Sequence, residues 1–326
     1  MTQGRKWHTA SVLDNGEVLV VGGVYSSYSQ SAELYNPSAG TWRNTSSMVD
    51  SRGDHTASVL QDGRVLVTGG FTGAVRLQSA EIYNSTTETW STTSSMSFNR
   101  MYHRAAVLQN GQVLITGGLG TTGCLKSCEL YDPLTETWAK TGNMSECRYQ
   151  HTISVLTNGS VLVTGGQSLS FPISTAELYN PVTGLWTNAM SMTYIRYYHT
   201  ATILSDGQVL VNGGADSSNS ALRTVELFNP LTGTWTMTGN MTYARYQHTT
   251  TLLNNGHALT AGGFNTIAMY ATVELYDPVT QQWTNPGNLT YGRYSHTASL
   301  LSNGRVLIVG GTDPATTLGL RTSELY

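Results

Sequence analysis

Seven times along the chain, two short apolar runs flank a turn that contains glycine. In the second copy, the run 55–60 is followed by Asp62-Gly63, by a second apolar run over 65–68 and by Gly69-Gly70. Two such runs separated by Asn-Gly or Asp-Gly are typical of a β-hairpin with a type I′ turn, because both central turn positions need a positive φ. Each copy therefore predicts an antiparallel pair of strands, here named a and b.

Each copy continues with two further strand-like segments. In the second copy a run that contains Glu81-Ile82-Tyr83 predicts strand c, and a run that starts at Trp90 predicts strand d. A second turn, which contains proline in most copies, lies between them. Each copy is thus expected to form a four-stranded antiparallel meander.

The copies recur every 47 to 49 residues. One four-stranded sheet cannot bury both of its faces, but seven sheets packed radially can. We therefore predict an all-β, seven-bladed β-propeller that forms a single domain over residues 1–326. The last copy ends at Tyr326 before any Trp segment, so the seventh blade is expected to lack its outer strand. The repeats start near His8, His55, His103, His151, His199, His248 and His296.

Composition narrows the classes of function. Charged residues make up 11% of the chain and the net charge is −3, so the basic stripe of a nucleic-acid-binding domain is missing. No apolar run approaches the length of a membrane span. Abundant serine, threonine and asparagine favour an extracellular protein, while localisation otherwise stays open. The near-identity of the copies indicates either recent duplication or a designed consensus.

All three cysteines fall in or just after the third copy. Cys124 lies in the b–c loop and Cys147 in the following d–a junction, so both are expected on one face of the ring and can form a disulfide in an oxidising compartment. Cys128 stands where other copies have alanine, which predicts a buried free thiol. The spacing of Cys124 and Cys128 is a poor zinc signal.

The Gly69-Gly70 pair, the tyrosine about twelve residues later and the tryptophan seven beyond it resemble the kelch repeat, and this resemblance covers the whole chain. It implies a kelch β-propeller. It does not imply one function, because kelch propellers include adaptors, lectin-like modules and a few enzymes.

The topology places the b–c loops and the d–a junctions on one face of the ring. The b–c loops vary most between copies, whereas the a–b and c–d turns barely vary. Variable loops on a rigid scaffold are where binding sites usually lie. We therefore predict a ligand site on the face formed by the b–c and d–a loops.

The d–a junctions carry an arginine in every copy, and tyrosines crowd beside several of them. Guanidinium groups bind carboxylates bidentately, and tyrosine rings stack on sugars or peptides. In kelch adaptors that bind acidic peptides, arginines at this repeat position contact the ligand, so the resemblance implies a site here. The candidate binding residues are Arg148, Arg196, Arg245, Arg293, Tyr149, Tyr194, Tyr197, Tyr198, Tyr243, Tyr246, Tyr291 and Tyr294.

A structural interpretation competes for the arginines. Each copy also has one glutamate at the start of strand c, at the same end of the blade as the arginine. Seven Arg–Glu pairs would tie the strands together without any ligand. The arginines are Arg5, Arg52, Arg100, Arg148, Arg196, Arg245 and Arg293, and the glutamates are Glu33, Glu81, Glu129, Glu177, Glu226, Glu274 and Glu324.

The repeated histidine has two interpretations as well. The segment from Arg196 to His199 is similar to one in the galactose-oxidase family of copper enzymes, and Tyr198 would then be the axial ligand and His199 an equatorial ligand. That family also needs a Tyr–Cys thioether, and none of the three cysteines falls at a strand-a ligand position. A histidine present in all seven copies rather predicts a buried side chain that is hydrogen-bonded to neighbouring backbone.

These patterns favour a non-catalytic module, with no cofactor and no metal, that recognises a protein, an acidic peptide or a glycan. Two alternatives remain open: a fragment of a copper-dependent oxidase and a structural repeat unit of an extracellular assembly. The unpaired edge of the seventh blade, over 322–326, is expected either to lower stability or to accept a strand from another chain.

Overall fold

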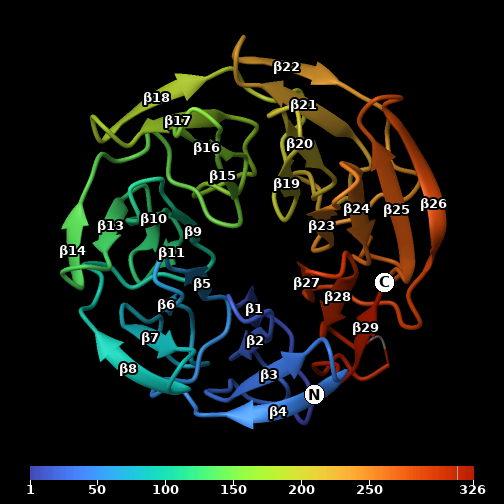
Figure 1. The fold of residues 1–326 in the computed structure, drawn as a ribbon. Helices are drawn as coiled ribbons and strands as arrows, with labels where there is room; N and C mark the ends of the chain where they lie inside the picture. The colour runs from blue at the N-terminus through green and yellow to red at the C-terminus, as the bar shows by residue number, and fades with distance from the viewer. Residues whose placement is uncertain (314) are drawn as a thin grey trace.

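Seven antiparallel sheets are arranged radially around a central channel, as Figure 1 shows. The structure is a computed structural model that describes residues 1–313 and 315–326, and these residues contain no helix. The predicted all-β, seven-bladed propeller is confirmed.

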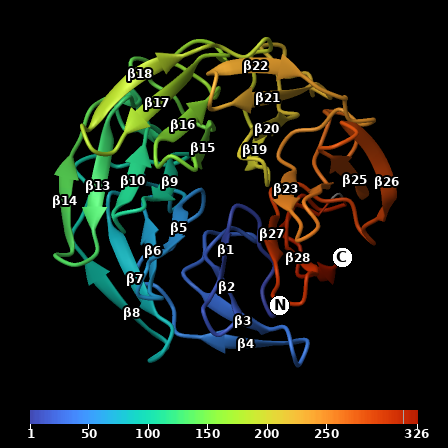
Figure 2. The ribbon, with the colours of Figure 1, turned by 45° about the horizontal axis from the view of Figure 1, so that its top comes forward.

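Strand a of each blade lines the channel, and strand b lies behind it (Figures 1 and 2). The a strands are β1 (Thr9–Val12), β5 (Thr56–Val59), β9 (Arg104–Val107), β15 (Thr152–Val155), β19 (Thr200–Ile203), β23 (Thr249–Leu252) and β27 (Thr297–Leu300). The b strands are β2 (Val18–Val21), β6 (Val65–Thr68), β10 (Val113–Thr116), β16 (Val161–Thr164), β20 (Val209–Asn212), β24 (Ala258–Ala261) and β28 (Val306–Val309).

Strands c and d complete each blade toward the outside. The c strands are β3 (Ala32–Asn36), β7 (Ala80–Asn84), β13 (Cys128–Asp132), β17 (Ala176–Asn180), β21 (Val225–Asn229), β25 (Thr272–Asp277) and β29 (Ser323–Leu325). The d strands are β4 (Thr41–Thr45), β8 (Thr89–Thr93), β14 (Thr137–Lys140), β18 (Leu185–Ala189), β22 (Thr234–Met237) and β26 (Gln282–Asn288).

The seventh blade has three strands, in the order β27-β28-β29, as expected from the sequence. The third blade adds a small hairpin that was not anticipated, formed by β11 (Leu119–Gly120) and β12 (Gly123–Cys124) within its b–c loop. The b strands are buried along their whole length, because each is covered on both faces by neighbouring blades.

Tyrosine and tryptophan fill the wedge between neighbouring blades. The rings of Tyr179 and Trp186 lie 5.0 Å apart, and Tyr179 packs against Met144 of the d–a junction. The hydroxyl of Tyr179 lies 2.7 Å from that of Thr141 in the preceding blade, and Trp186 donates a hydrogen bond to the carbonyl of Gly142. The polar ends of both rings are thus satisfied across the interface, as buried aromatic residues require.

The double glycine after strand b allows the next blade to approach closely. A Cβ on Gly165 would lie 2.6 Å from the backbone oxygen of Arg196 and 2.8 Å from the ring of His199. Gly165 and Gly166 also have φ values of 59° and 96°. Only glycine meets both requirements without strain.

The blades close into a ring between the seventh and the first. The backbone of Arg5 donates to Leu320 at 3.0 Å and accepts from Gly311 at 2.8 Å, which joins the start of the chain to the seventh blade. The amino terminus also lies beside Arg321, with a nitrogen-to-oxygen distance of 3.5 Å. In the described residues, no helix is long and apolar enough to cross a membrane.

Candidate functional site

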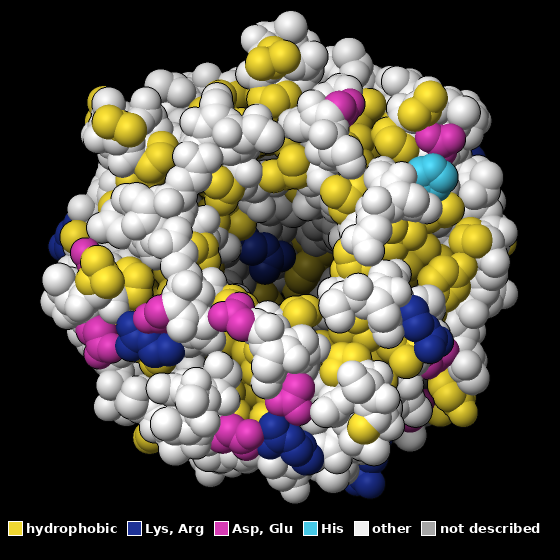
Figure 3. Space-filling model, in the orientation of Figure 1, with side chains coloured by type: hydrophobic (Ala, Val, Ile, Leu, Met, Phe, Trp, Pro, Cys, Tyr) yellow, Lys and Arg dark blue, Asp and Glu magenta, His cyan; other side chains and the backbone are white. Residues whose placement is uncertain are grey.

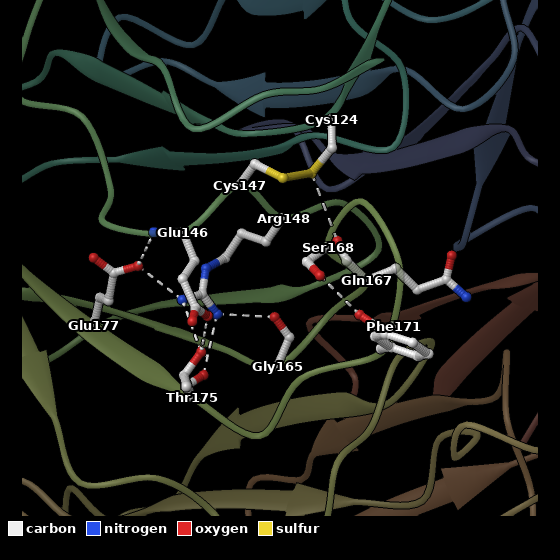
Figure 4. Close-up of a disulfide and its surroundings, with 10 residues drawn as sticks. All are labelled: Cys124, Glu146, Cys147, Arg148, Gly165, Gln167, Ser168, Phe171, Thr175 and Glu177. Carbon is white, nitrogen blue, oxygen red and sulfur yellow. Dashed lines mark hydrogen bonds and ion pairs between the residues drawn. A yellow bond between two sulfur atoms is a disulfide. The ribbon is translucent and has the colours of Figure 1, made fainter.

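The repeated arginines are buried and paired with the repeated glutamates. All seven arginine side chains are enclosed, with at most 1% of the side chain exposed. Figure 4 shows Arg148, whose guanidinium group donates to the carbonyl of Gly165 at 2.9 Å and to Glu177 at 2.8 Å. The predicted Arg–Glu pairs are therefore present in every blade.

The glutamates also hold the d–a junctions. Glu226 accepts hydrogen bonds from the backbone N–H groups of Thr193 and Tyr194, at 2.7 and 3.2 Å, in addition to its contact with Arg196. Burial lowers the pKa of Arg196, and the charge of Glu226 opposes this shift. Arg148, Arg196, Arg245 and Arg293 thus position the loops of this face and present no free guanidinium group to a ligand.

Aromatic residues form a continuous arc around the channel mouth on this face. Tyr198 lies between Tyr102 and Tyr246, with ring centroids 6.5 and 6.4 Å away, and Tyr102 also contacts Tyr149. The arc continues from Tyr246 through Phe264 to Tyr294, while Tyr197 packs on Tyr198. The rim is here defined as Tyr102, Tyr149, Tyr197, Tyr198, Tyr246, Phe264 and Tyr294.

Three further candidate tyrosines lie outside the rim. Tyr194 and Tyr291 have 40% and 50% of their surface exposed. Tyr243 packs on Tyr270 at 5.3 Å, and both rings lie within 6 Å of the guanidinium carbon of Arg245. The structure therefore brings together Tyr149, Tyr197, Tyr198, Tyr246 and Tyr294, with the exposed tyrosines farther out on the same face.

A ring of backbone hydrogen bonds surrounds the channel, and it includes Tyr102 and Tyr198 of the rim. The residue before each repeated histidine has φ between 52° and 56°, a left-handed conformation that non-glycine residues rarely adopt. Its N–H donates to the carbonyl of the equivalent residue in the preceding blade at 3.0 to 3.3 Å. These ring positions are Trp7, Asp54, Tyr102, Gln150, Tyr198, Gln247 and Ser295.

The ring positions enclose a cavity of about 200 Å³ in the channel. Arg104, the first residue of β9, also lines this cavity and a second one, of about 290 Å³, among the a strands. Figure 3 shows the channel open on one face of the molecule, with a basic side chain visible inside it. The channel is therefore a polar pocket rather than a closed core.

Burial perturbs the ionisable groups of the channel. It raises the pKa of the Asp54 carboxyl to about 7, although a hydrogen bond from Tyr102 and the charges of Arg104 and Lys6 act in the opposite direction. Burial, followed by the charge of Asp54, also raises the pKa of the Tyr198 hydroxyl. Asp54 is thus poised to change charge near neutral pH.

The histidines link neighbouring blades. His199 is 3% exposed, and its Nε2 lies 3.1 Å from the hydroxyl of Thr152 and 3.2 Å from that of Thr164, both in the preceding blade. The expected buried and hydrogen-bonded state is confirmed, but the partner is a threonine hydroxyl. Burial and nearby arginines hold the pKa of His199 well below its usual range, so the ring is neutral.

Tyr198 and His199 do not form part of a metal-binding cluster. Over residues 1–313 and 315–326, no group of three or more His, Cys, Asp or Glu side chains is placed to hold a metal ion. The residues present do not fit a copper centre, because the Nε2 atom of His199 already faces two threonine hydroxyls.

Cys124 and Cys147 lie close together and Cys128 is buried, as the sequence predicted, while the disulfide itself had been left open. Cys124 and Cys147 form a disulfide, with Cα atoms 5.5 Å apart, which joins the b–c loop to the d–a junction next to Arg148 (Figure 4). Cys128 is a buried free thiol, and burial raises its pKa to about 12.

Comparison with known families agrees with this geometry. The model of the KLHDC2/KLHL20/DRC7 Kelch-repeats domain matches residues 1–166, and that of the Kelch motif matches residues 148–193 and 196–242. The chain belongs to the kelch-repeat family. No curated protein sequence matches this kelch protein.

Solved structures add a likeness in fold. A fungal alcohol oxidase of the AA5 family, solved in complex with copper, superposes on this kelch propeller with a TM-score of 0.81. The two share 19% sequence identity over 97% of this chain and 73% of the oxidase chain. At that identity the likeness shows the fold alone.

Several channel residues of this kelch propeller were missed by sequence reasoning. Asp54, Gln150 and Gln247 directly precede repeated histidines. The residue at this position differs from copy to copy, although the histidine that follows it and the arginine two positions before it are present in all seven copies. Arg104 replaces the threonine that follows the histidine in the six other copies. Both departures from the repeat are visible in the sequence, but only the folded structure shows that these positions line one cavity.

Proposed function

We propose that this kelch propeller is a non-catalytic binding module that recognises a protein, a peptide or a glycan on the face formed by its b–c and d–a loops. The observation that carries the proposal is the continuous aromatic rim around the channel mouth. Kelch membership supports a binding role in general but names no ligand.

The chemistry of the rim suits recognition. Tyrosine offers a large, amphipathic contact surface at a low cost in side-chain entropy, which is why it is enriched in binding hot spots. The d–a junctions that carry Tyr194 and Tyr246 are fixed by the buried Arg–Glu pairs, so these side chains are held in place before any ligand arrives. Tyr197 is only 7% exposed and supports the rim from beneath. A preference for acidic peptides has less support, because the guanidinium groups that would provide it are engaged by glutamates.

The test is a selection on two ligand collections, a glycan array and a displayed random-peptide library. We expect a selected ligand to lose at least about tenfold in affinity, or about 1.4 kcal/mol, for Tyr246→Ala and for Tyr291→Ala. Leu134→Ser and Leu231→Ser are matched controls, since both side chains are over 90% exposed in c–d turns on the opposite face. A ligand that is insensitive to both tyrosine changes, or lost in the leucine variants, would refute this assignment.

The fold likeness to a copper-dependent oxidase makes one alternative worth a direct measurement. Metal analysis of the purified protein after incubation with copper decides it. A copper-to-protein ratio of one that falls on His199→Gln would support an oxidase. A ratio near zero supports the binding module.

Within the residues that the structure describes, β29 pairs with β28 alone, and its outer edge has no strand partner. This edge supports a further part of the proposal, which concerns self-association. Its residues are only half-buried, and Glu324 keeps 17% of its side chain exposed, whereas the equivalent glutamates keep 2% or less. We propose that this edge pairs with a strand of another copy or of an assembly partner. Appending a turn and a Trp-containing strand with the sequence of residues 283–292 should raise the melting temperature and abolish concentration-dependent association. An unchanged melting temperature with a monomeric parent chain would contradict the idea.

A further inference from the structure

Arg104 departs from the repeat at a position that normally links two blades. In the other copies a threonine follows the histidine, as with Thr56, whose hydroxyl lies 3.0 Å from Nε2 of His103. In the third blade Arg104 takes that place, and His151 instead bonds to the hydroxyl of Thr116 at 2.8 Å. The link between blades therefore does not need the arginine.

The guanidinium group of Arg104 is held at one point only. Its Nε donates to the carbonyl of His151 at 2.7 Å. Among residues 1–313 and 315–326, no side chain or carbonyl accepts from its two terminal amino groups, and no carboxylate forms an ion pair with it. By contrast, the buried Arg148 donates to two carbonyls, a hydroxyl and a carboxylate. Arg104 thus offers a planar pair of donors to the channel, the geometry that binds a carboxylate.

Gln150 contributes a buried side-chain amide to the lining of the cavity that Arg104 also lines. Gln150 directly precedes His151, whose backbone carbonyl accepts the hydrogen bond from Nε of Arg104. Gln150 is 6% exposed, and its Nε2 donates to the hydroxyl of Tyr198. Its Oε1 is buried and accepts from no donor in the described part of the chain. A buried amide oxygen without a donor is costly, and a ligand hydroxyl would supply that donor.

The other ionisable groups that line the cavity are compatible with the binding of an anion beside Arg104. His8, His55, His248 and His296 line it, and burial lowers the pKa of all four, so they are neutral. Asp54 is the one carboxyl in the lining, and burial raises its pKa to about 7. At pH 6 most of this carboxyl is protonated, so the charge of Arg104 is not cancelled.

We propose that the channel binds small hydroxycarboxylates, with the carboxylate on the guanidinium group of Arg104 and a hydroxyl that donates to Oε1 of Gln150. Tyr102 and Tyr198 of the rim also line this cavity, but the proposed site does not depend on a macromolecular ligand at the rim. A cavity of about 200 Å³ accommodates a molecule of a few heavy atoms.

The experiment is a calorimetric titration at pH 6 with three probes: glycolate, its neutral analogue glycolamide, and acetate, which lacks the hydroxyl. We expect saturable binding of glycolate, with at least tenfold weaker binding of the other two. Arg104→Thr, which restores the residue of the six other copies, should weaken glycolate binding at least tenfold. Gln150→Leu should weaken glycolate while leaving acetate unchanged.

Two results would overturn the proposal: no saturable binding of glycolate by the wild-type protein, or equal affinity of the wild type and Arg104→Thr. The melting temperature of each variant is measured alongside to establish that it is folded. Arg104→Lys provides a second variant, because it keeps the charge but loses the planar pair of donors. We expect it to bind glycolate more weakly than the wild type, and equal binding would also contradict the proposed contact. Failure of Tyr246→Ala and Tyr291→Ala to alter peptide or glycan binding would not affect this result.

Discussion

Each repeated arginine ties the start of its blade to strands b and c. Arg196 donates to the carbonyls of Gly213 and Thr224, and it forms an ion pair with Glu226 in which neither side chain is exposed. A pair of this kind is strongly destabilised when one partner is removed, because the other charge stays buried and uncompensated. Loss of one partner of this buried pair should therefore lower the free energy of unfolding more than loss of one partner of an exposed Arg–Glu pair.

Replacing Arg196 by methionine should therefore lower the free energy of unfolding by about 3 to 5 kcal/mol. The matched control is Arg43→Gln, which removes an arginine that is 43% exposed and paired with Glu17 and Glu88. That change should cost less than about 1 kcal/mol. Urea denaturation measures both, and similar losses in the two variants would show that burial does not set the strength of the pair.

Asp54 gives stability a pH dependence of its own. Its pKa is raised in the folded state to about 7, whereas an unfolded aspartate ionises near 4. Unfolding therefore releases a proton between these values, and the wild type loses stability as the pH rises from about 4 to about 7. Well above pH 7 the Asp54 carboxylate is buried in its charged form, and the full loss of stability is present.

Asp54→Asn removes this penalty. The variant should match the wild type near pH 4 and melt at a higher temperature at pH 8. Melting curves of both proteins at matched pH values test this, and a difference that is independent of pH would contradict the raised pKa. Because both proteins keep the seven histidines, whose low pKa values destabilise the fold in acid, the comparison isolates Asp54.

Most strands could be predicted because their signals are local. Asp62-Gly63 sets a hairpin by turn chemistry, and Trp90 marks the start of the outer strand, which the structure places at 89–93. The β11–β12 hairpin carried no comparable signal, because its pairing depends on how the b–c loop packs in the folded blade. The ring of backbone hydrogen bonds around the channel had no local signal in the sequence either. Six of its seven hydrogen bonds join residues about 48 positions apart, and the seventh joins Trp7 to Ser295.

The disulfide is the one covalent link between two of these elements. It joins the b–c loop of the third blade to the following d–a junction across 23 residues. A loop of that length corresponds to about 3 kcal/mol when the bond is removed, by the entropy of closing it in the unfolded chain.

Cys124→Ser should lower the stability by about that amount under non-reducing conditions. The control is Cys128→Ala, which places in the third blade the residue found at Ala32 and Ala176 and should change stability little. Thermal melts with and without reductant measure both variants. A Cys124→Ser protein that melts with the oxidised wild type would show that the bond does not support the fold.

At the scale of the whole molecule, the propeller has two unlike faces. One carries near-identical a–b and c–d turns, and the other carries the varied loops, the rim and the disulfide. Five of the seven rim residues were candidates from the sequence because tyrosines accumulate in the later copies, whereas Tyr102 and Phe264 were not among the candidates. The sequence could not decide whether the repeated arginines pair with glutamates or bind a ligand, because the same pattern of charges fits a ligand site and an internal ion pair.

The most direct test of the binding face is a hydrogen-exchange footprint of the protein with a ligand selected from the glycan array or the peptide library. Bound ligand should slow exchange in the d–a segments 193–198, 242–247 and 290–295 and in the b–c loops beside them. The a–b and c–d turns, such as 205–207 and 230–233, should exchange as in the free protein. Protection confined to those turns, with unchanged exchange at the rim, would contradict the proposed function.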